Sequence, residues 1–355
     1  MNVRTLNPDL LKVARQSRAL SQAQLAEKSG VSQAAISKAE SGLLPLGEEF
    51  VQKLATALKY PVSLFYELDR IFGLPISLQY RKRASVGQRA LEQLEAEVNL
   101  RLMHLRRLLR SIDFEAEFEL PSLDCDELGG PDAVAERLRR TWLIPTGPIR
   151  NLVEVVERAG CVVFSCEFHS LGVDGLTLSP LGMPHCIFIN SELPADRQRF
   201  TIAHELGHLV MHRGGSQFME EEANAFAAAF LMPHADIAGD LAGGLSLPRL
   251  AGLKRTWRVS MAALIYRAHT IGAINENQNT SLWRQMATKG FRKREPVELD
   301  FPPEEPGVLP GLIQMHQADL GYSVAELAKV VGLHEPEFVR GYRLEPRRAH
   351  LRLVV

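Results

Sequence analysis

The sequence lacks a strong charge excess, a long apolar run and a signal-like N-terminus. Its 41 Lys and Arg residues nearly balance 42 Asp and Glu residues, which gives a formal net charge of -1. This balance excludes a chain that is basic throughout, so any nucleic-acid site must be a local patch. No run of about 18 apolar residues occurs, and no apolar segment follows residues 1–4. We therefore expect a cytoplasmic protein with no membrane partner.

Cysteine is scarce and its spacing is irregular. There is no C-x-x-C pair, and the four cysteines are Cys125, Cys161, Cys166 and Cys186. In a chain of 355 residues this spacing favours buried reduced thiols over metal ligands or disulfides. With 46% hydrophobic and 23% charged residues, the composition is that of a soluble globular protein with two or three domains.

Breaks in the helical pattern divide the chain into four predicted parts. They are an all-α five-helix unit at 1–70, a helical linker at 71–125, a region with helices and strands at 126–275, and a helical extension at 276–355. The linker helix, over about 88–112, has one apolar and one basic face, which suits either packing on its own chain or dimerisation. Short strands are predicted at 161–165 and 186–190. The predicted fold class is mainly α with a small β-sheet (α+β).

The segment His204-Glu205-Leu206-Gly207-His208 has the spacing of a metal site. On a helix, residues four apart lie on one face, so both imidazoles can reach one metal ion at about 2.0–2.1 Å. Glu205 lies beside the first ligand, where its carboxylate can act as a general base. The pattern predicts Zn²⁺ as the cofactor, with His204 and His208 as ligands and Glu205 as the catalytic residue.

A second predicted helix, at 219–232, offers a third ligand. It is rich in small residues and can pack closely on the first helix. We prefer Glu222 because it shares a helical face with Phe226 and Phe230, the side expected to face the core. The alternatives are Glu220, Glu221 and His212. Three histidines on one straight helical face cannot easily converge on a tetrahedral ion, which counts against the last of these.

These segments resemble the ImmA/IrrE family of metallopeptidases. The resemblance rests on Arg-Phe-Thr-Ile-Ala-His-Glu-Leu-Gly-His at 199–208 and Glu-Ala-Asn-Ala-Phe-Ala-Ala-Ala-Phe-Leu-Met-Pro at 222–233, and it spans about 130–275. It implies a zincin-like peptidase domain with His204 and His208 as ligands, Glu205 as base and Glu222 as third ligand. Members are associated with cleaving a helix-turn-helix repressor in trans, which relieves repression. Neither motif identifies an oxyanion stabiliser, for which the candidates are His185, His212 and His234.

The N-terminal helices have the pattern of a helix-turn-helix. Ser21 and Ser32 are placed as N-caps on either side of a turn at Gly30. Residues 11–65 resemble an XRE-type (lambda-repressor-like) domain, in which the second helix of the motif enters the major groove. The expected DNA contacts are Gln33, Ala34, Ser37 and Lys38, with Gln22 toward phosphate. Such a unit could instead bind protein. A weaker look-alike at 323–340 lacks a basic recognition helix, so we expect a structural role there.

Together these motifs predict a DNA-binding transcriptional regulator with a zinc-dependent endopeptidase domain, of the stress-response kind. The expected partners are double-stranded operator DNA, a protein substrate such as a helix-turn-helix repressor, and a second copy in a homodimer. One alternative is a transcription factor whose peptidase fold is a catalytically silent sensor. Another is an antitoxin-like module that binds protein. The intact H-E-x-x-H motif favours activity, since a silent site has no chemical need for Glu205.

Overall fold

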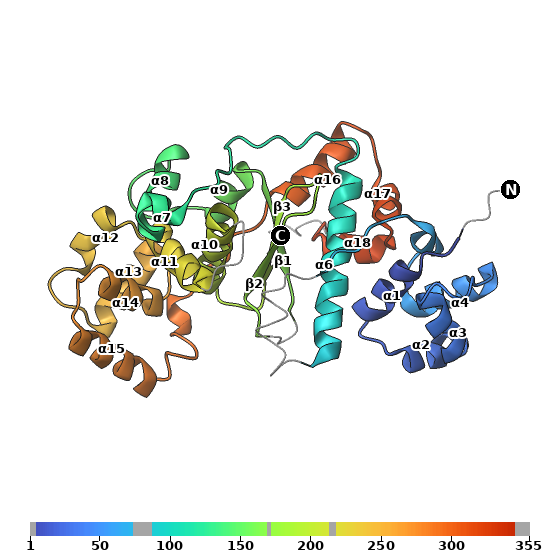
Figure 1. Cartoon of the computed structure of the whole chain (residues 1–355), viewed down its shortest axis with the longest axis horizontal. Helices are drawn as coiled ribbons and strands as arrows, with labels where there is room; N and C mark the ends of the chain where they lie inside the picture. The colour runs from blue at the N-terminus through green and yellow to red at the C-terminus, as the bar shows by residue number, and fades with distance from the viewer. Residues whose placement is uncertain (1–4, 74–86, 169–171, 213–217, 345–355) are drawn as a thin grey trace, which may run out of the picture. The chain divides into compact units, whose positions relative to one another are not determined.

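The computed structural model describes residues 5–73, 87–168, 172–212 and 218–344 (Figure 1). It forms two compact units. The terminal unit contains residues 1–114 and 308–355, and the central unit contains residues 115–307. The predicted extension at 276–355 is thus shared between them. Helices dominate, and the described residues form one three-stranded sheet, which confirms the predicted α+β class.

The terminal unit is helical throughout its described part. Its elements are α1 (Pro8–Ser17), α2 (Gln22–Ser29), α3 (Gln33–Glu40), α4 (Glu48–Leu58), the 3-10 helix η1 (Val62–Tyr66), α6 (Gln88–Leu108), α16 (Val308–Ala318), α17 (Val324–Val331) and α18 (Glu335–Gly341). The predicted caps are confirmed: Ser21 forms a capping box with Gln24, and the Ser32 side chain accepts from the N–H of Ala35. Between them Gly30 has φ +69°, the left-handed conformation that ends α2.

The linker helix α6 packs on its own chain rather than presenting an open apolar face. Its residues Leu94, Val98, Leu102, Leu105 and Leu108 are buried. Helices α1, α16 and α17 contact it within the terminal unit. This is the first of the two alternatives considered for this helix.

Polar contacts at the end of α6 join early and late parts of the chain. Buried Arg107 pairs with Asp69 at 2.6 Å and donates to the carbonyl of Val330 at 3.0 Å. His316 is 2.8 Å from the carbonyl oxygen of Leu108. Gly332 ends α17 with φ +83°, and a Cβ atom there would lie 3.0 Å from Arg107 Nη1. Residues 323–340 therefore serve packing, as expected of the weaker look-alike.

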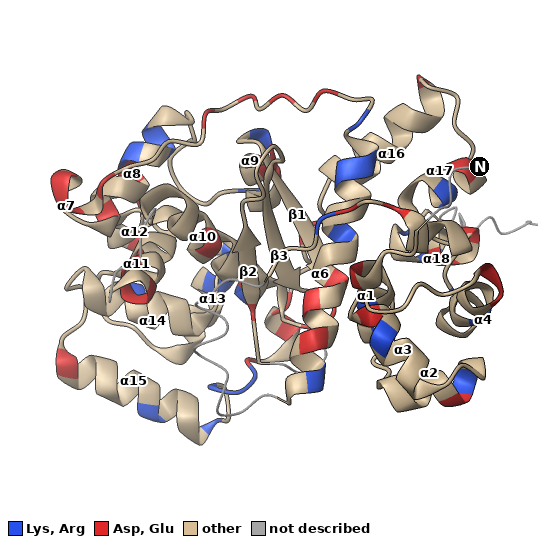
Figure 2. Cartoon of the chain, turned by 45° about the vertical axis from the view of Figure 1, so that its right-hand side comes forward, with Lys and Arg blue, Asp and Glu red and all other residues tan. Residues whose placement is uncertain are grey.

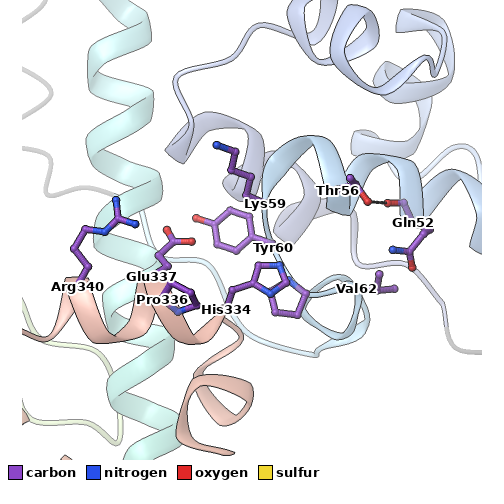
Figure 3. A pocket seen from close by; sticks show the side chains of 10 residues that line it. Gln52, Thr56, Lys59, Tyr60, Val62, His334, Pro336, Glu337 and Arg340 are labelled. Atoms are coloured by element: carbon purple, nitrogen blue, oxygen red, sulfur yellow. Dashed lines mark hydrogen bonds between the residues drawn. The ribbon is translucent and has the colours of Figure 1, made fainter. Parts of the chain in front are cut away.

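Helix α18 faces the end of α4 and residues 59–62 across a pocket of about 530 Å³ (Figure 3). The Arg18 guanidinium lies 4.1 Å from the centre of the Tyr60 ring. It forms a bidentate ion pair with the Glu337 carboxylate, with N–O distances of 2.7 and 2.8 Å. Glu337 and Arg340 of α18 face Lys59 and Tyr60 across the pocket (Figure 3). The C-terminal helices are thus part of the same compact unit as α1 to α4.

The central unit packs its helices against a small sheet, which α9 and α10 contact directly. Its elements are α7 (Cys125–Leu128), α8 (Pro131–Thr141), α9 (Leu152–Arg158), β1 (Cys161–Cys166), β2 (Gly175–Leu178), β3 (His185–Asn190), α10 (Ala195–Met211), α11 (Met219–Leu231), α12 (His234–Leu241), α13 (Leu247–Trp257), α14 (Met261–Thr270), α15 (Glu276–Thr288) and the 3-10 helix η2 (Val297–Leu299). The strand order is β1-β3-β2, with β1 parallel and β2 antiparallel to β3. Both predicted strands are present. Strand β2 was not predicted, because it is four residues long and buries only Leu176.

Helices α10 and α11 approach each other closely where Gly207 meets Phe226. A Cβ atom at Gly207 would lie 2.9 Å from the Phe226 ring, so only glycine fits this crossing. Two buried arginines hold the end of α11: Arg139 donates to the carbonyl of Phe230 at 2.8 Å, and Arg267 donates to that of Met232 at 2.9 Å. These bonds satisfy carbonyls that a helix end leaves without partners. The position of α11 against α10 is therefore well defined.

The cysteines and the helix lengths can also be compared with what the sequence predicted. All four cysteines are free thiols, and Cys161, Cys166 and Cys186 are buried. Burial raises the pKa of the Cys161 thiol to about 12. Among the described residues, no helix combines the length and the apolarity that crossing a membrane requires.

Candidate metal centre and helix-turn-helix surface

Helices α10 and α11 bring two histidines and one glutamate together. His204 and His208 lie one turn apart on α10, with their Nε2 atoms 3.1 Å from each other. Glu220, in the first turn of α11, places Oε2 3.4 Å from Nε2 of His204 and Oε1 3.6 Å from Nε2 of His208. We call these three residues the metal cluster. Their ligand atoms all lie within 4.8 Å of one another.

The spacing of the metal cluster fits a tetrahedral zinc ion. With metal–ligand bonds of about 2.0–2.2 Å, the ligand atoms of a tetrahedral site are about 3.3–3.6 Å apart. The Nε2–Nε2 separation of 3.1 Å and the shortest separations to the carboxylate, 3.4 Å to Oε2 and 3.6 Å to Oε1, lie close to this range. Two imidazoles and one carboxylate also form a common donor set of catalytic zinc sites, which leaves a fourth position open.

Both imidazoles are oriented by a second polar side chain. Nδ1 of His204 lies 3.0 Å from Oδ1 of Asn224, an acceptor. The tautomer that donates from Nδ1 to this oxygen leaves the Nε2 lone pair for a metal ion. Nδ1 of His208 lies 2.9 Å from Nδ1 of His212, whose Nε2 lies 2.9 Å from Glu222. Because the Glu222 carboxylate accepts from Nε2 of His212, Nδ1 of His212 can accept from His208. The same Nε2 orientation results.

Glu220 lies next to His204 and His208. Glu222, the residue expected there, does not contact this pair directly and lies next to His212 instead. Glu222 contacts His212, which is the C-cap of α10 and no longer on its helical face. Glu221 is exposed. The reason is the crossing of the two helices. Phe226 packs against Gly207, and the polar face carrying Glu220 and Asn224 meets His204.

The expected base, Glu205, is buried next to the metal cluster. Its side chain accepts a hydrogen bond from the hydroxyl of Thr177 at 2.6 Å, and the residue is 8% exposed. Thr177 lies on β2, so the sheet edge holds the carboxylate from one side while α10 carries it. This contact fixes the direction of the Glu205 carboxylate.

The three histidines considered as oxyanion stabilisers occupy different places. His212 bridges His208 and Glu222. His185 lies on β3 with Nδ1 2.7 Å from the Ser179 hydroxyl, and partial burial lowers its pKa. His234 is exposed at the start of α12. Of the three, His212 is the one that directly contacts a residue of the metal cluster.

The candidate DNA surface lies on α3. Gln33, Ala34 and Lys38 are exposed and Ser37 is half-buried, so all four lie on the accessible part of this helix. Gln22, at the start of α2, donates to Glu40 at 2.9 Å. Helices α1 to α4 carry both basic and acidic residues (Figure 2). Any attraction for phosphate must therefore come from the local arrangement of a few cations.

Glu40 joins the two helices of the motif to α1. Its carboxylate pairs with the buried guanidinium of Arg15 at 2.6 and 2.9 Å, in addition to the bond from Gln22. The side-chain amide of Gln22 is thus already engaged in a hydrogen bond with Glu40. A phosphate contact from it requires that bond to open or the backbone to donate in its place.

Two site residues escaped the sequence analysis. Thr177 was missed because β2 was not predicted, although Gly175-Leu-Thr-Leu178 alternates apolar and other residues after a glycine. Asn224 follows Glu220 by four residues, so the two share a helical face. That shared polar face was the available signal for both the third ligand and the partner of His204.

Comparison with known proteins agrees with both parts of this description. Residues 11–65 match a helix-turn-helix family model, and residues 156–269 match the model of the IrrE N-terminal-like domain. The chain is 35% identical to the radiation response metalloprotease IrrE of Deinococcus deserti, over 28% of this chain and 46% of that protein. It thus spans less than half the length of this relative. The chain carries an N-terminal helix-turn-helix domain and a domain of the IrrE N-terminal-like metallopeptidase family.

Proposed function

We propose that the central unit is a zinc-dependent endopeptidase. The observation that carries this proposal is the convergence of His204, His208 and Glu220 beside the buried carboxylate of Glu205. His204 and His208 would hold the zinc ion together with Glu220, which the geometry favours over Glu222 as third ligand. The matched family and the name of the Deinococcus protein support the same activity.

Each residue of the site has a defined part in peptide hydrolysis. Zinc, when bound, supplies a Lewis acid and lowers the pKa of a water ligand. Glu205 takes a proton from the attacking water and passes it to the departing amine as the C–N bond breaks. Thr177 keeps the Glu205 carboxylate directed at that water. Asn224 and His212 keep the imidazoles of His204 and His208 directed at the ion.

We further propose that the terminal unit binds double-stranded DNA through α3. Gln33, Ala34, Ser37 and Lys38 would contact base edges in the major groove, with Gln22 at the start of α2 near a phosphate. The exposure of these residues and the match to the helix-turn-helix model support this role. As a homodimer, the protein would bind half-sites about 10–10.5 base pairs apart, or a multiple of that spacing.

The proposed substrate is a helix-turn-helix repressor or a related regulatory protein, cut at an exposed loop. This rests on the family resemblance and on the stress-related name of the relative. DNA binding in the same chain would bring the enzyme to the promoters where such a repressor acts. The result is a regulator that relieves repression under stress.

The test compares wild-type cells with cells that carry Glu205→Gln. This substitution keeps the size and hydrogen bonding of the side chain but removes the base, so zinc content and fold should persist while cleavage is lost. Repressor integrity is followed by immunoblot and target-gene induction by transcript level. Equal induction with intact repressor in both strains would replace the peptidase by the catalytically silent sensor. Zinc content of the purified proteins separates loss of the base from loss of the metal.

A further inference from the structure

A second feature of the central unit is a pocket of about 1110 Å³ whose lining includes residues of α10 and α11 next to those of the metal cluster. Asn224, which orients His204, lies on its wall. Thr201, one helical turn before Glu205, also lines it. A polypeptide bound across the metal cluster can therefore extend directly into this pocket.

The far wall comes from outside the matched IrrE N-terminal-like domain, which ends at residue 269. Trp283 of α15 and Phe291 supply half-buried aromatic rings, and Arg292 and Lys293 are exposed beside them. The Arg292 guanidinium lies 5.5 Å from the centre of the Trp283 ring. This wall therefore lies outside the part of the chain that matches the family model.

A buried ionic network fixes the far wall to α10. Glu295, two residues after Lys293, accepts from Lys254 Nζ at 2.7 Å and from the N–H groups of Met261 and Ala262 at 3.1 and 3.2 Å. Lys254 is fully buried and also pairs with Asp196 in the first turn of α10. The helix that carries the metal ligands and the far wall thus share one anchor, so the shape of the pocket is largely preformed.

The lining combines apolar surface with a one-sided positive charge. Phe200 of α10 faces the pocket together with the two aromatic residues of the far wall. Two other arginines that line it are neutralised: Arg197 by Asp174 at 2.7 Å and Arg294 by Asp300. Lys293 and Arg292 give the aromatic side its positive charge. The exposed acidic residues of the pocket, Glu192 and Glu221, come instead from the segment before α10 and from α11.

We propose that this pocket selects the substrate by binding a large apolar side chain next to the cleaved bond, with carboxylates beside it. The occupant is an extended polypeptide segment in which Phe, Leu or a similar residue is followed by Asp or Glu. The aromatic rings contact the apolar side chain, and Arg292 and Lys293 attract the carboxylates. This inference rests on the proposed peptidase function, since it assigns the substrate class of the same site.

The test measures binding of fluorescent peptides to the full-length Glu205→Gln protein loaded with zinc, which separates recognition from turnover. The peptides are about ten residues long and differ at the centre: Phe followed by two Asp, Ala followed by two Asp, and Phe followed by two Lys. Burying one Phe side chain corresponds to a preference of roughly tenfold or more over Ala. The Phe-Asp peptide should also bind more tightly than the Phe-Lys peptide, and this difference should shrink at high salt.

Variants of the far wall assign these preferences. Phe291→Ala should reduce the preference for Phe, and the Arg292→Glu, Lys293→Glu double variant should reverse the preference for Asp. Arg284→Glu, an exposed change on α15 outside the pocket lining, should alter neither. The double variant changes only exposed residues, so it remains informative if Phe291→Ala does not fold.

Equal binding of all three peptides, or preferences that no far-wall variant changes, would overturn the inference. If the three peptides bind equally but the wild-type protein cleaves its substrate, the proposed specificity is wrong and the proposed peptidase activity is retained. If the peptides bind selectively but nothing is cleaved, the peptidase activity is wrong and the specificity is retained.

Discussion

In the metal cluster both imidazoles are held by a second polar side chain, whereas three of the four α3 residues proposed to read DNA are exposed. His204 is oriented by Asn224 and His208 by His212, and Glu205 is held by Thr177. Gln33 and Lys38 have no comparable burial. A reacting centre has to be in place before substrate arrives, while a DNA-reading surface can be ordered by the groove it enters. Preorganisation therefore marks the chemical site of this chain, and accessibility marks its binding surface.

Removing the preorganised ligands should give the largest effect. The His204→Ala, His208→Ala double variant should lose its zinc, from about one ion per chain to almost none, because a catalytic site needs three protein ligands. Elemental analysis of purified protein measures this, with His185→Ala as the control that keeps its metal. Undiminished zinc in the double variant would place the metal elsewhere in the chain.

The order of effects in the first turn of α11 sharpens the distinction between ligands and the residues that orient them. Glu220→Ala should weaken zinc binding most, because it removes a ligand. Glu222→Ala and Asn224→Ala should weaken it by about 10–100-fold, as for groups that orient ligands. Competition with a chelator ranks the three, and exposed Glu221→Ala should change little. A larger loss for Glu222→Ala than for Glu220→Ala would return the ligand to the residue first preferred from sequence.

On the accessible surface, single substitutions should have moderate effects. Gln33→Ala should cost roughly 1–3 kcal/mol at a cognate site and relax base preference at one position. Lys38→Ala should weaken binding and reduce its salt dependence. Selection of bound sequences from a random pool, followed by titration at two salt concentrations, tests both. A salt-insensitive affinity with no enriched sequence would mean that this unit binds protein instead.

Protonation of the buried His104 imidazole should lower the free energy of unfolding of the terminal unit. Burial lowers the pKa of His104 well below its usual range, and neighbouring Arg101 and Arg107 act in the same direction. The unfolded chain binds the proton at about pH 6.5, so the stability due to neutral His104 is present above that pH and is lost as pH falls below it. Denaturant unfolding at pH 8 and pH 5 should show a smaller loss for His104→Gln than for wild type. The exposed His334→Gln variant should behave like wild type.

The smallest effect is expected from the contact between α1 and α18. Arg18 and Glu337 keep 28% and 33% of their side-chain surface exposed, so a double-mutant cycle should give a coupling free energy of only about 0–1 kcal/mol. Alanine substitutions at both positions, singly and together, provide the cycle. The exposed Lys53–Glu49 pair within α4 is the matched control. A coupling of several kcal/mol would show that solvent screens the Arg18 pair far less than its exposure indicates.

Sequence predicted most of what depends on neighbours along the chain. The caps at Ser21 and Ser32, the helix with His204 and His208, and the two strands at 161–165 and 186–190 all follow from local pattern. These features need only residues within a few positions of each other.

What sequence could not give depends on how the elements cross. The choice between Glu220 and Glu222 is set by the rotation of α11, which the contact of Phe226 with Gly207 fixes. Thr177 reaches Glu205 only because β2 joins the sheet next to α10. Residues 308–344 join α6 through contacts such as that of His316 with Leu108, 208 residues away in sequence. No local pattern encodes such a separation.

That long separation has a consequence for synthesis and for breakage of the chain. The terminal unit is discontinuous, with residues 115–307 inserted between its two parts. During translation, the whole central unit is made before α16 and α17 can pack on α6, so the apolar residues of α6 that α1 does not cover are exposed to chaperones or to misassembly in that interval. A protease that cuts at one junction, near Phe114 or near Val308, leaves the units joined through the other. Two cuts are required to release the metal centre from the DNA-binding unit.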